Sequence, residues 1–292
     1  MNPGKLFREA VDNNAILQCI GATTAYHAIM AEKSGAQSLY VSGGGVAAGS
    51  LGVPDLGIST LNDVAIDVER ISARTELPIL VDIDTGWGGS FNISRAIYTL
   101  EKAGAGAVHI EDQVQQKRCG HRPNKELVSK SEMVDRIKSA VDARRCDDFV
   151  IMARTDALAL EGIQSAVDKA TAFAEAGADM IFPEALNTIE QYKEFSDSLN
   201  VPILANITEF GQTPLFSKEE LFEAGVDMVL YPLSAFRAMS KAALNVYQHI
   251  LQDGHQNNVL ETMQTREELY DFLYYHQYEE QLDELINKES KQ

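Results

Sequence analysis

The chain has 292 residues, of which 45% are apolar and 23% are charged, and its formal net charge is −18 at pH 7. This composition is typical of a soluble globular protein, and no apolar run approaches the roughly 18 residues that a membrane span requires. The acidic balance argues against nucleic acid and anionic membranes as partners, because both attract basic patches. Three scattered cysteines and a polar N-terminus without a secretory signal predict a cytoplasmic protein.

Eight short apolar runs alternate with amphipathic helical stretches along the chain. They lie near 16–21, 38–43, 77–84, 107–113, 148–156, 180–185, 201–208 and 228–233. Four of them follow the related phrases KSGAQ, KAGAG, EAGAD and EAGVD, in which a left-handed glycine is expected to end a helix. Apolar runs of this kind indicate parallel strands, and eight units predict a (β/α)8 barrel. A doubly wound open sheet is the alternative, which the count of eight and the even composition disfavour.

We expect one barrel domain over residues 1–292, with two additions. The segment 113–130, QVQQKRCGHRPNKELVSK, has neither the strand nor the helix period, and its length predicts a mobile active-site loop. Residues 233–292 are expected to form a C-terminal helical extension beyond the eighth unit. Its apolar residues could pack on this barrel or on a neighbouring subunit; they are Leu269, Phe272, Leu273, Leu282 and Leu285.

Polar side chains follow most of the apolar runs, at the end where a barrel carries its functional groups. They are Ser42, Asp82, Asp84, His109, Glu111, Arg154, Asp156, Glu184, Asn206 and Thr208. An inert scaffold would have little use for such groups, because each must be solvated or paired. His109 fits either a functional role or a merely satisfied buried histidine. Arg154 fits either bidentate binding of a carboxylate or pairing with a neighbouring acid.

The pair Asp82 and Asp84 predicts a metal site. Alternate residues of a strand point to one face, and carboxylate oxygens suit Mg2+ or Mn2+. Glu111 and Asp55 are candidates for water-mediated contacts with the ion. The chain has no His/Cys cluster with the spacing of a zinc site.

The run SGGGVAAG can be aligned with the dinucleotide fingerprint, but the residues after it include Gly52, Pro54 and Gly57 and cannot supply the long helix of that motif. We expect instead a glycine turn whose backbone amides approach a small anion. In the loop motif KRCGH, the side chains of Lys117, Arg118 and His121 either favour the thiolate of Cys119 or hold a thiol ready to donate its proton. A nucleophilic hydrolase is the alternative to a metal-bound anionic substrate.

Motifs from across the chain carry a family resemblance. They are KRCGH, YVSGGGVAAG, LVDIDTGWGG, VHIEDQ, ARTDA, FPEA and LANITEFG. Through these motifs the chain resembles the isocitrate lyase and phosphoenolpyruvate mutase superfamily nearly end to end. Arg118 and the short chain point to its methylisocitrate-cleaving branch. The resemblance implies a carbon–carbon lyase that converts 2-methylisocitrate to pyruvate and succinate in the methylcitrate cycle of propionate breakdown. A lyase for isocitrate or dimethylmalate, or a non-catalytic metabolite-binding relative, is the alternative.

The same resemblance implies residue roles. Asp82 and Asp84 would bind Mg2+, with Mn2+ as an alternative, and Cys119 would be the general acid, with His121 beside it. Tyr40 and Asp55 are both candidates for the base. Substrate contacts are implied for Ser42, Gly43, Gly44, Gly120, Arg154, Glu184, Asn206, Ile207, Thr208, Arg237 and Arg266. An apolar wall of Phe182, Leu230 and Pro232 would accept the methyl group. The resemblance further implies a homotetramer in which the helix after the eighth strand is exchanged between subunits.

Overall fold

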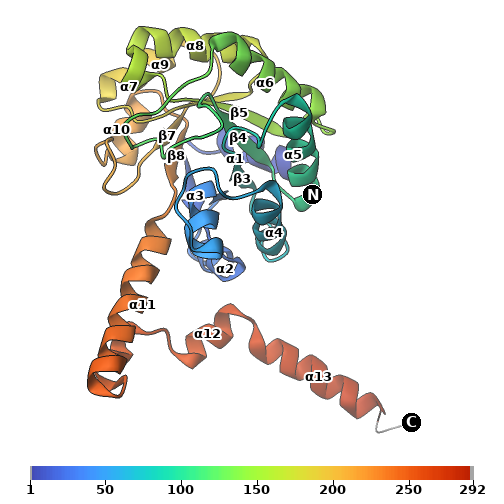
Figure 1. Cartoon of the computed structure of the whole chain (residues 1–292). Helices are drawn as coiled ribbons and strands as arrows, with labels where there is room; N and C mark the ends of the chain where they lie inside the picture. The colour runs from blue at the N-terminus through green and yellow to red at the C-terminus, as the bar shows by residue number, and fades with distance from the viewer. Residues whose placement is uncertain (1, 290–292) are drawn as a thin grey trace. The chain divides into compact units, whose positions relative to one another are not determined.

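Eight parallel strands form the sheet of the first of two compact units (Figure 1), in a computed structural model that describes residues 2–289. They are β1 (Leu17–Gly21), β2 (Ser38–Val41), β3 (Ile79–Asp82), β4 (Ala107–Glu111), β5 (Val150–Thr155), β6 (Met180–Pro183), β7 (Leu204–Asn206) and β8 (Met228–Tyr231). The order in the sheet is β6-β5-β4-β3-β2-β1-β8-β7. A parallel bridge between Ile181 and Ile203 brings β6 to the segment before β7. The strands thus form a nearly closed barrel, which confirms the predicted (β/α)8 fold.

Helices follow the strands and surround the barrel (Figure 1). They are α2 (Ala25–Lys33), α3 (Gly43–Gly45), the π-helical segment η1 (Val46–Leu51), α4 (Leu61–Ser72), α5 (Ser90–Ala103), α6 (Lys130–Ala143), α7 (Leu158–Glu161), α8 (Ile163–Glu175), α9 (Ile189–Ser198) and α10 (Lys218–Glu223). The glycines of the four repeated phrases have the expected left-handed φ, between 80° at Gly225 and 106° at Gly177. Each stands at or just beyond a helix end, so the repeated phrase marks the helix-to-strand turn as predicted.

The apolar core has two parts, one between strands and helices and one inside the barrel. The inner part includes Leu17, Leu80 and Met152 from the strands, and it also contains Phe7 from the N-terminal helix α1 (Pro3–Asp12). A Cβ at Gly106, just before β4, would lie 2.5 Å from the carbonyl oxygen of Pro3, so only glycine allows this close approach. Helix α1 therefore covers the amino ends of the strands, and the carboxyl ends are left for a site.

The second unit begins at Arg237 and is helical. It contains most of α11 (Ser234–Asp253), the 3-10 segment η2 (Asn257–Thr262), α12 (Arg266–Phe272) and α13 (Tyr275–Glu289). The helices predicted for this part of the sequence are thus present. What the apolar residues of the extension pack against stays a prediction. Within residues 2–289, no helix is long and apolar enough to cross a membrane.

Candidate active site

Two buried carboxylates lie together at the end of β3. Asp82 is the last residue of the strand, its Oδ1 accepts the backbone N–H of Asp84 at 2.9 Å, and its Oδ2 accepts that of Gly43 at 3.1 Å. The prediction from the sequence attributes this pair to the alternation of side chains along a strand. That explanation is wrong, because Asp84 lies beyond the end of the strand, with a left-handed φ of 48°. A Cβ at Gly43 would lie 3.0 Å from Asp82 Oδ2 and 3.1 Å from Asp84 Oδ1. The missing side chain of Gly43 therefore leaves space next to both carboxylates.

The donor set of this pair fits a hard divalent cation. Burial would raise the pKa of Asp82, but His109, Lys117 and Arg154 together lower it to about 2. Burial and the charge of Asp82 raise the pKa of Asp84 to about 6. The described residues contain no group of three or more His, Cys, Asp and Glu side chains arranged to hold a metal ion. Mg2+ needs no such cage, because it usually keeps several waters and takes further ligands from its substrate.

Lys117 supplies the positive charge beside the two aspartates. Its Nζ lies 2.7 Å from Asp84 Oδ1 and also forms an ion pair with Asp55. The neighbouring charges of Asp84, Glu111, Asp82 and Asp55 raise the pKa of Lys117 although its burial would lower it. The lysine of the KRCGH motif is thus paired with acids and stays charged.

A tyrosine and a histidine lie below the carboxylates, inside the barrel. The hydroxyl of Tyr40 is 2.8 Å from His109 Nε2 and 3.4 Å from Asp82 Oδ2. Burial raises the pKa of Tyr40 well above its usual value, and burial lowers that of His109 to about 4. At neutral pH both groups are therefore uncharged, and the Tyr40 hydroxyl acts as a hydrogen-bond donor.

Arg154 lies at the end of β5 among three acids. Its Nε is 2.9 Å from Asp156 Oδ2, its Nη2 is 3.1 Å from Glu184 Oε2, and its Nη1 is 3.4 Å from Glu111 Oε2. The pairing with neighbouring acids, one of the two predicted alternatives, is therefore present. Burial raises the pKa of Glu111 well above its usual value, and its buried Oε1 has no hydrogen-bond partner. An unsatisfied buried oxygen of this kind is expected where a ligand or ion completes the contacts.

The KRCGH loop meets the end of β7 through His121. Its Nδ1 accepts the backbone N–H of Gln212 at 3.0 Å, which places the ring proton on Nε2, 3.3 Å from Glu184 Oε1. The side-chain nitrogen of Asn206 lies 3.3 Å from the same Glu184 oxygen. Burial lowers the pKa of His121, so the ring is neutral at physiological pH.

The Cys119 thiol is half-buried, and its burial raises its pKa. The cations that were considered as activators point elsewhere, since Lys117 contacts acids and Arg118 is exposed. Of the two alternatives left open by the sequence, the protonated thiol therefore fits the structure and the thiolate does not.

Polar contacts at both ends hold the loop, and its middle lacks regular structure. Gln113 and Leu127 form an antiparallel bridge, and the Gln113 amide exchanges two hydrogen bonds with the backbone of Arg118, at 2.9 and 3.0 Å. Lys125 Nζ donates to the carbonyl oxygen of Gly120 at 2.7 Å and to Asp156 Oδ1 at 2.7 Å. Sequence reasoning missed Gln113 and Lys125, because nothing in their spacing indicates which distant group they meet.

The glycine run differs from the expected turn. Ser42 caps a helix that begins at Gly43, and the π-helical segment continues to Leu51, before Pro54. The helical stretch ends at Leu51, so the long helix of the dinucleotide motif is absent, as the sequence predicted, but a short helix start stands where a turn was expected. The backbone N–H of Gly43, the first residue of this helix, donates to Asp82 Oδ2. This hydrogen bond connects the start of the helix to the carboxylate pair.

The other predicted residues divide between the two units. Ser42, Asn206, Ile207 and Thr208 are buried at strand ends of the first unit. The ring centroids of Phe182 and His109 lie 5.2 Å apart, so this residue of the predicted apolar wall borders the polar cluster. Arg237 and Arg266 belong to the second unit, and their roles stay predictions.

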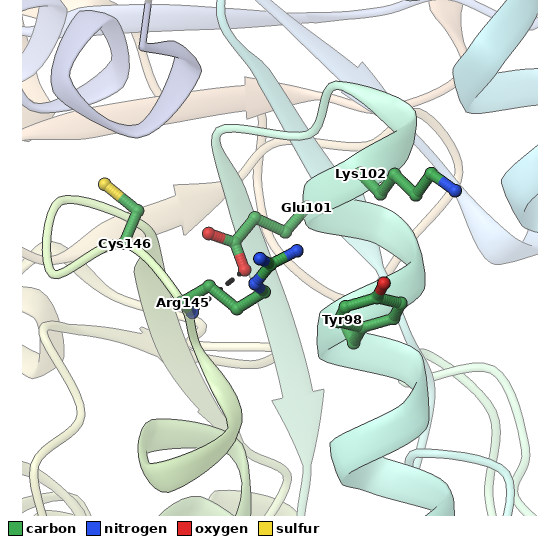
Figure 2. Close-up of a pocket in the computed structure, with 5 residues that line it drawn as sticks. All are labelled: Tyr98, Glu101, Lys102, Arg145 and Cys146. Carbon is green, nitrogen blue, oxygen red and sulfur yellow. Dashed lines mark hydrogen bonds between the residues drawn. The ribbon is translucent and has the colours of Figure 1, made fainter.

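A cavity of about 340 Å³ lies at the other end of the barrel (Figure 2). Tyr98, Glu101 and Lys102 line it from the last turns of α5, and Arg145 and Cys146 line it from the segment before β5. The Arg145 guanidinium lies 5.3 Å from the Tyr98 ring centroid, and its backbone N–H bonds to Glu101. None of the predicted site residues lines this cavity.

Comparison with known proteins connects this geometry to one family. Residues 7–251 match the family described as phosphoenolpyruvate phosphomutase. The chain is 61% identical to a 2-methylisocitrate lyase of Vibrio cholerae, over 99% of this chain and 96% of that protein. A crystal structure of 2,3-dimethylmalate lyase superposes with a TM-score of 0.89 at 33% identity, covering 96% and 94% of the two chains. A phosphonopyruvate hydrolase complex with oxalate and Mg2+ gives 0.83 at 27% identity, covering 96% and 97%.

Proposed function

Because this chain belongs to the phosphoenolpyruvate phosphomutase family, we propose that it cleaves the carbon–carbon bond of 2-methylisocitrate to give pyruvate and succinate. The observation that carries the choice of substrate is the 61% identity to a 2-methylisocitrate lyase over nearly the whole length of both proteins. This reaction would serve propionate breakdown through the methylcitrate cycle.

Asp82 and Asp84 would hold Mg2+, with Mn2+ as an alternative. When bound, the ion would supply Lewis acidity to the hydroxyl and carboxylate of the substrate. Around it, the chain's own groups would bind the trianion. Arg154 presents a guanidinium at the strand ends, and Arg237 and Arg266 are proposed to add two further cations.

Bond cleavage needs a base to take the substrate hydroxyl proton. Tyr40 is a weak candidate because burial raises its pKa, so its neutral phenol would donate a hydrogen bond rather than accept a proton. Asp55 is the better candidate, since Lys117 holds its carboxylate beside the aspartate pair. Loss of the proton lets the C2–C3 bond break, which leaves the ketone of pyruvate and a carbanion on the succinate fragment.

Cys119 would protonate that carbanion. Its raised pKa keeps the thiol protonated at neutral pH, as a general acid requires. His121 and Glu184 would fix the loop beside the thiol, and the closed loop would keep water from the carbanion. Phe182, Leu230 and Pro232 would accept the methyl group, which is worth about 1–3 kcal/mol in an apolar pocket.

A homotetramer in the cytoplasm, with α11 exchanged between subunits, is part of the same proposal. It would give the exposed apolar side chains of the second unit a partner surface, among them Leu282 and Leu285. Sedimentation equilibrium would test the assembly, and a monomer at micromolar concentration would refute it.

The substrate assignment is tested by kcat/KM for 2-methylisocitrate, isocitrate and 2,3-dimethylmalate with Mg2+ present. We expect 2-methylisocitrate to be preferred by about tenfold or more over isocitrate, from the value of one buried methyl group. Equal or reversed preference would refute the assignment. Preference for 2,3-dimethylmalate would favour the second candidate function, which rests on the TM-score of 0.89 to that lyase. No turnover of any of them would indicate a binding protein.

A further inference from the structure

Lys125 is a buried lysine that neither the sequence motifs nor the proposed reaction uses. Its side chain is 3% exposed and its ammonium makes two contacts, one with a backbone carbonyl and one with a carboxylate. Burying an ammonium is costly unless it is paired and hydrogen-bonded. The position of Lys125 therefore depends on both partners remaining in place.

The carbonyl partner belongs to Gly120, the residue after Cys119. Gly120 lies close against two groups of the site, since a Cβ there would lie 2.6 Å from Glu184 Cγ and would also collide with Arg154 Nη2. The Gln113 amide holds the backbone of Arg118 on the other side of the cysteine. Cys119 thus lies between two backbone anchors, one at Arg118 and one at Gly120.

The carboxylate partner is Asp156, which is fully buried and shared with Arg154. Asp156 Oδ1 accepts from Lys125 at 2.7 Å, and Oδ2 accepts from Arg154 Nε at 2.9 Å. The backbone N–H of Asp156 is held in turn by Asp112 Oδ1 at 2.9 Å. One rigid carboxylate therefore fixes both the loop and the guanidinium.

We propose that Lys125 is a positioning residue that holds the Cys119 loop closed by connecting the Gly120 carbonyl to the carboxylate that orients Arg154. The consequence for turnover rests on the proposed role of Cys119 as the acid. The consequence for loop position does not, because it follows from the contacts alone.

The first test is alkylation of the protein by iodoacetamide, with the modified cysteines read by mass spectrometry. In Lys125→Met, loss of the ammonium should free the loop and raise the rate at Cys119 by about tenfold or more, the value of a hydrogen bond from a charged donor. Cys146 lies before β5, at the amino end of the barrel, and is the internal control, with an unchanged rate. An unchanged ratio of the two rates would overturn the proposal.

Lys169→Met is the matched control variant. Lys169 is also a buried lysine in an ion pair, 2.8 Å from Glu161 Oε1, and this partner lies in α7, outside the loop. It should leave the Cys119 to Cys146 ratio as in the wild type. An equal rise in both variants would show a general loss of stability and would also overturn the proposal. Should Lys125→Met fail to fold, Asp156→Asn removes the same ion pair with an isosteric side chain and should give the same rise at Cys119.

Turnover of 2-methylisocitrate separates this inference from the proposed function. In Lys125→Met we expect kcat to fall about tenfold or more, with KM changed less, because the acid is misplaced while the binding groups remain. A rise in Cys119 alkylation without any wild-type turnover would leave the loop inference standing and refute the function. A fall in KM and kcat by the same factor, with unchanged alkylation, would refute the positioning role.

Discussion

The two ends of the barrel both carry clusters of charge, but they satisfy them differently. At the amino end, Asp179 accepts from Arg8 at 2.7 Å, from Arg144 at 2.8 Å and from the backbone N–H of Ile151 at 2.8 Å. At the carboxyl end, buried atoms near Arg154 lack hydrogen-bond partners, among them Glu111 Oε1 and the amide oxygen Asn206 Oδ1. The carboxylate of the first cluster is paired within the chain, and the second cluster leaves buried polar atoms open to a water, an ion or a ligand.

This difference separates a structural role from a functional one. Charge alone would rank the two clusters together, since both hold arginine–carboxylate pairs with short contacts, although the Arg154 cluster is the more deeply buried. The unsatisfied atoms, and the raised pKa of Glu111 and Asp84 that burial causes, occur at the carboxyl end. Variants at the amino end should therefore change stability, and variants at the carboxyl end should change activity.

Removal of divalent cations should have the largest effect. With EDTA, turnover should fall below detection, because the Asp82 and Asp84 carboxylates would have no ion to present to the substrate. Fold should persist, since Lys117 remains paired with Asp84 at 2.7 Å. The measurement is a coupled assay for pyruvate together with circular dichroism, before and after Mg2+ is restored. Full activity in EDTA would contradict the metal assignment.

Substitution of Cys119 should come next. Cys119→Ser should lower kcat by about 10²–10⁴-fold, the usual contribution of a general acid. Cys146→Ser, in the cavity of Figure 2, should leave kcat within about twofold of the wild type, and it is the matched control. Steady-state kinetics on both variants checks this. Equal activities in the two would remove the acid role from Cys119.

At the amino end, Asp179→Ala should lower the free energy of unfolding by about 2–3 kcal/mol, because Arg8, Arg144 and the Ile151 N–H lose a charged partner. The kcat of the folded variant should not change. Urea denaturation and kinetics on one preparation test both parts. A fall in kcat larger than the loss of folded protein would show that the two ends are not independent.

The pH dependence should show the smallest effect. A general acid works only while protonated, so kcat should fall as pH rises through the Cys119 pKa. Because burial raises that pKa, the fall should lie above about pH 8.5, the usual value for cysteine. A kcat profile from about pH 6 to 10 tests this, with Cys119→Ser expected to lack the alkaline limb. A limb below about pH 8 would contradict the direction of the shift.

The sequence predicts the barrel because its signals are local. Strand periodicity and helix-ending glycines such as Gly104 and Gly177 are read within a few residues, and all eight strands lie where expected. Asp82, Arg154 and Glu184 could also be assigned to one rim, since strand ends meet there.

The contacts within the site could not be predicted in the same way. Lys125 and Asp156 are 31 residues apart in the chain, and no sequence period links them. Asp84 reaches its partner by a left-handed turn rather than by strand alternation, and the glycine run forms a helix start. These features depend on how the loop ends pack, which only the folded chain determines.

The most direct test of the central claim is a crystal of the full chain grown with Mn2+, pyruvate and succinate, with the ion located by its anomalous signal. We expect one ion beside Asp82 and Asp84, with the two products between it and Cys119. An ion bound elsewhere, or products at the amino end of the barrel, would contradict it.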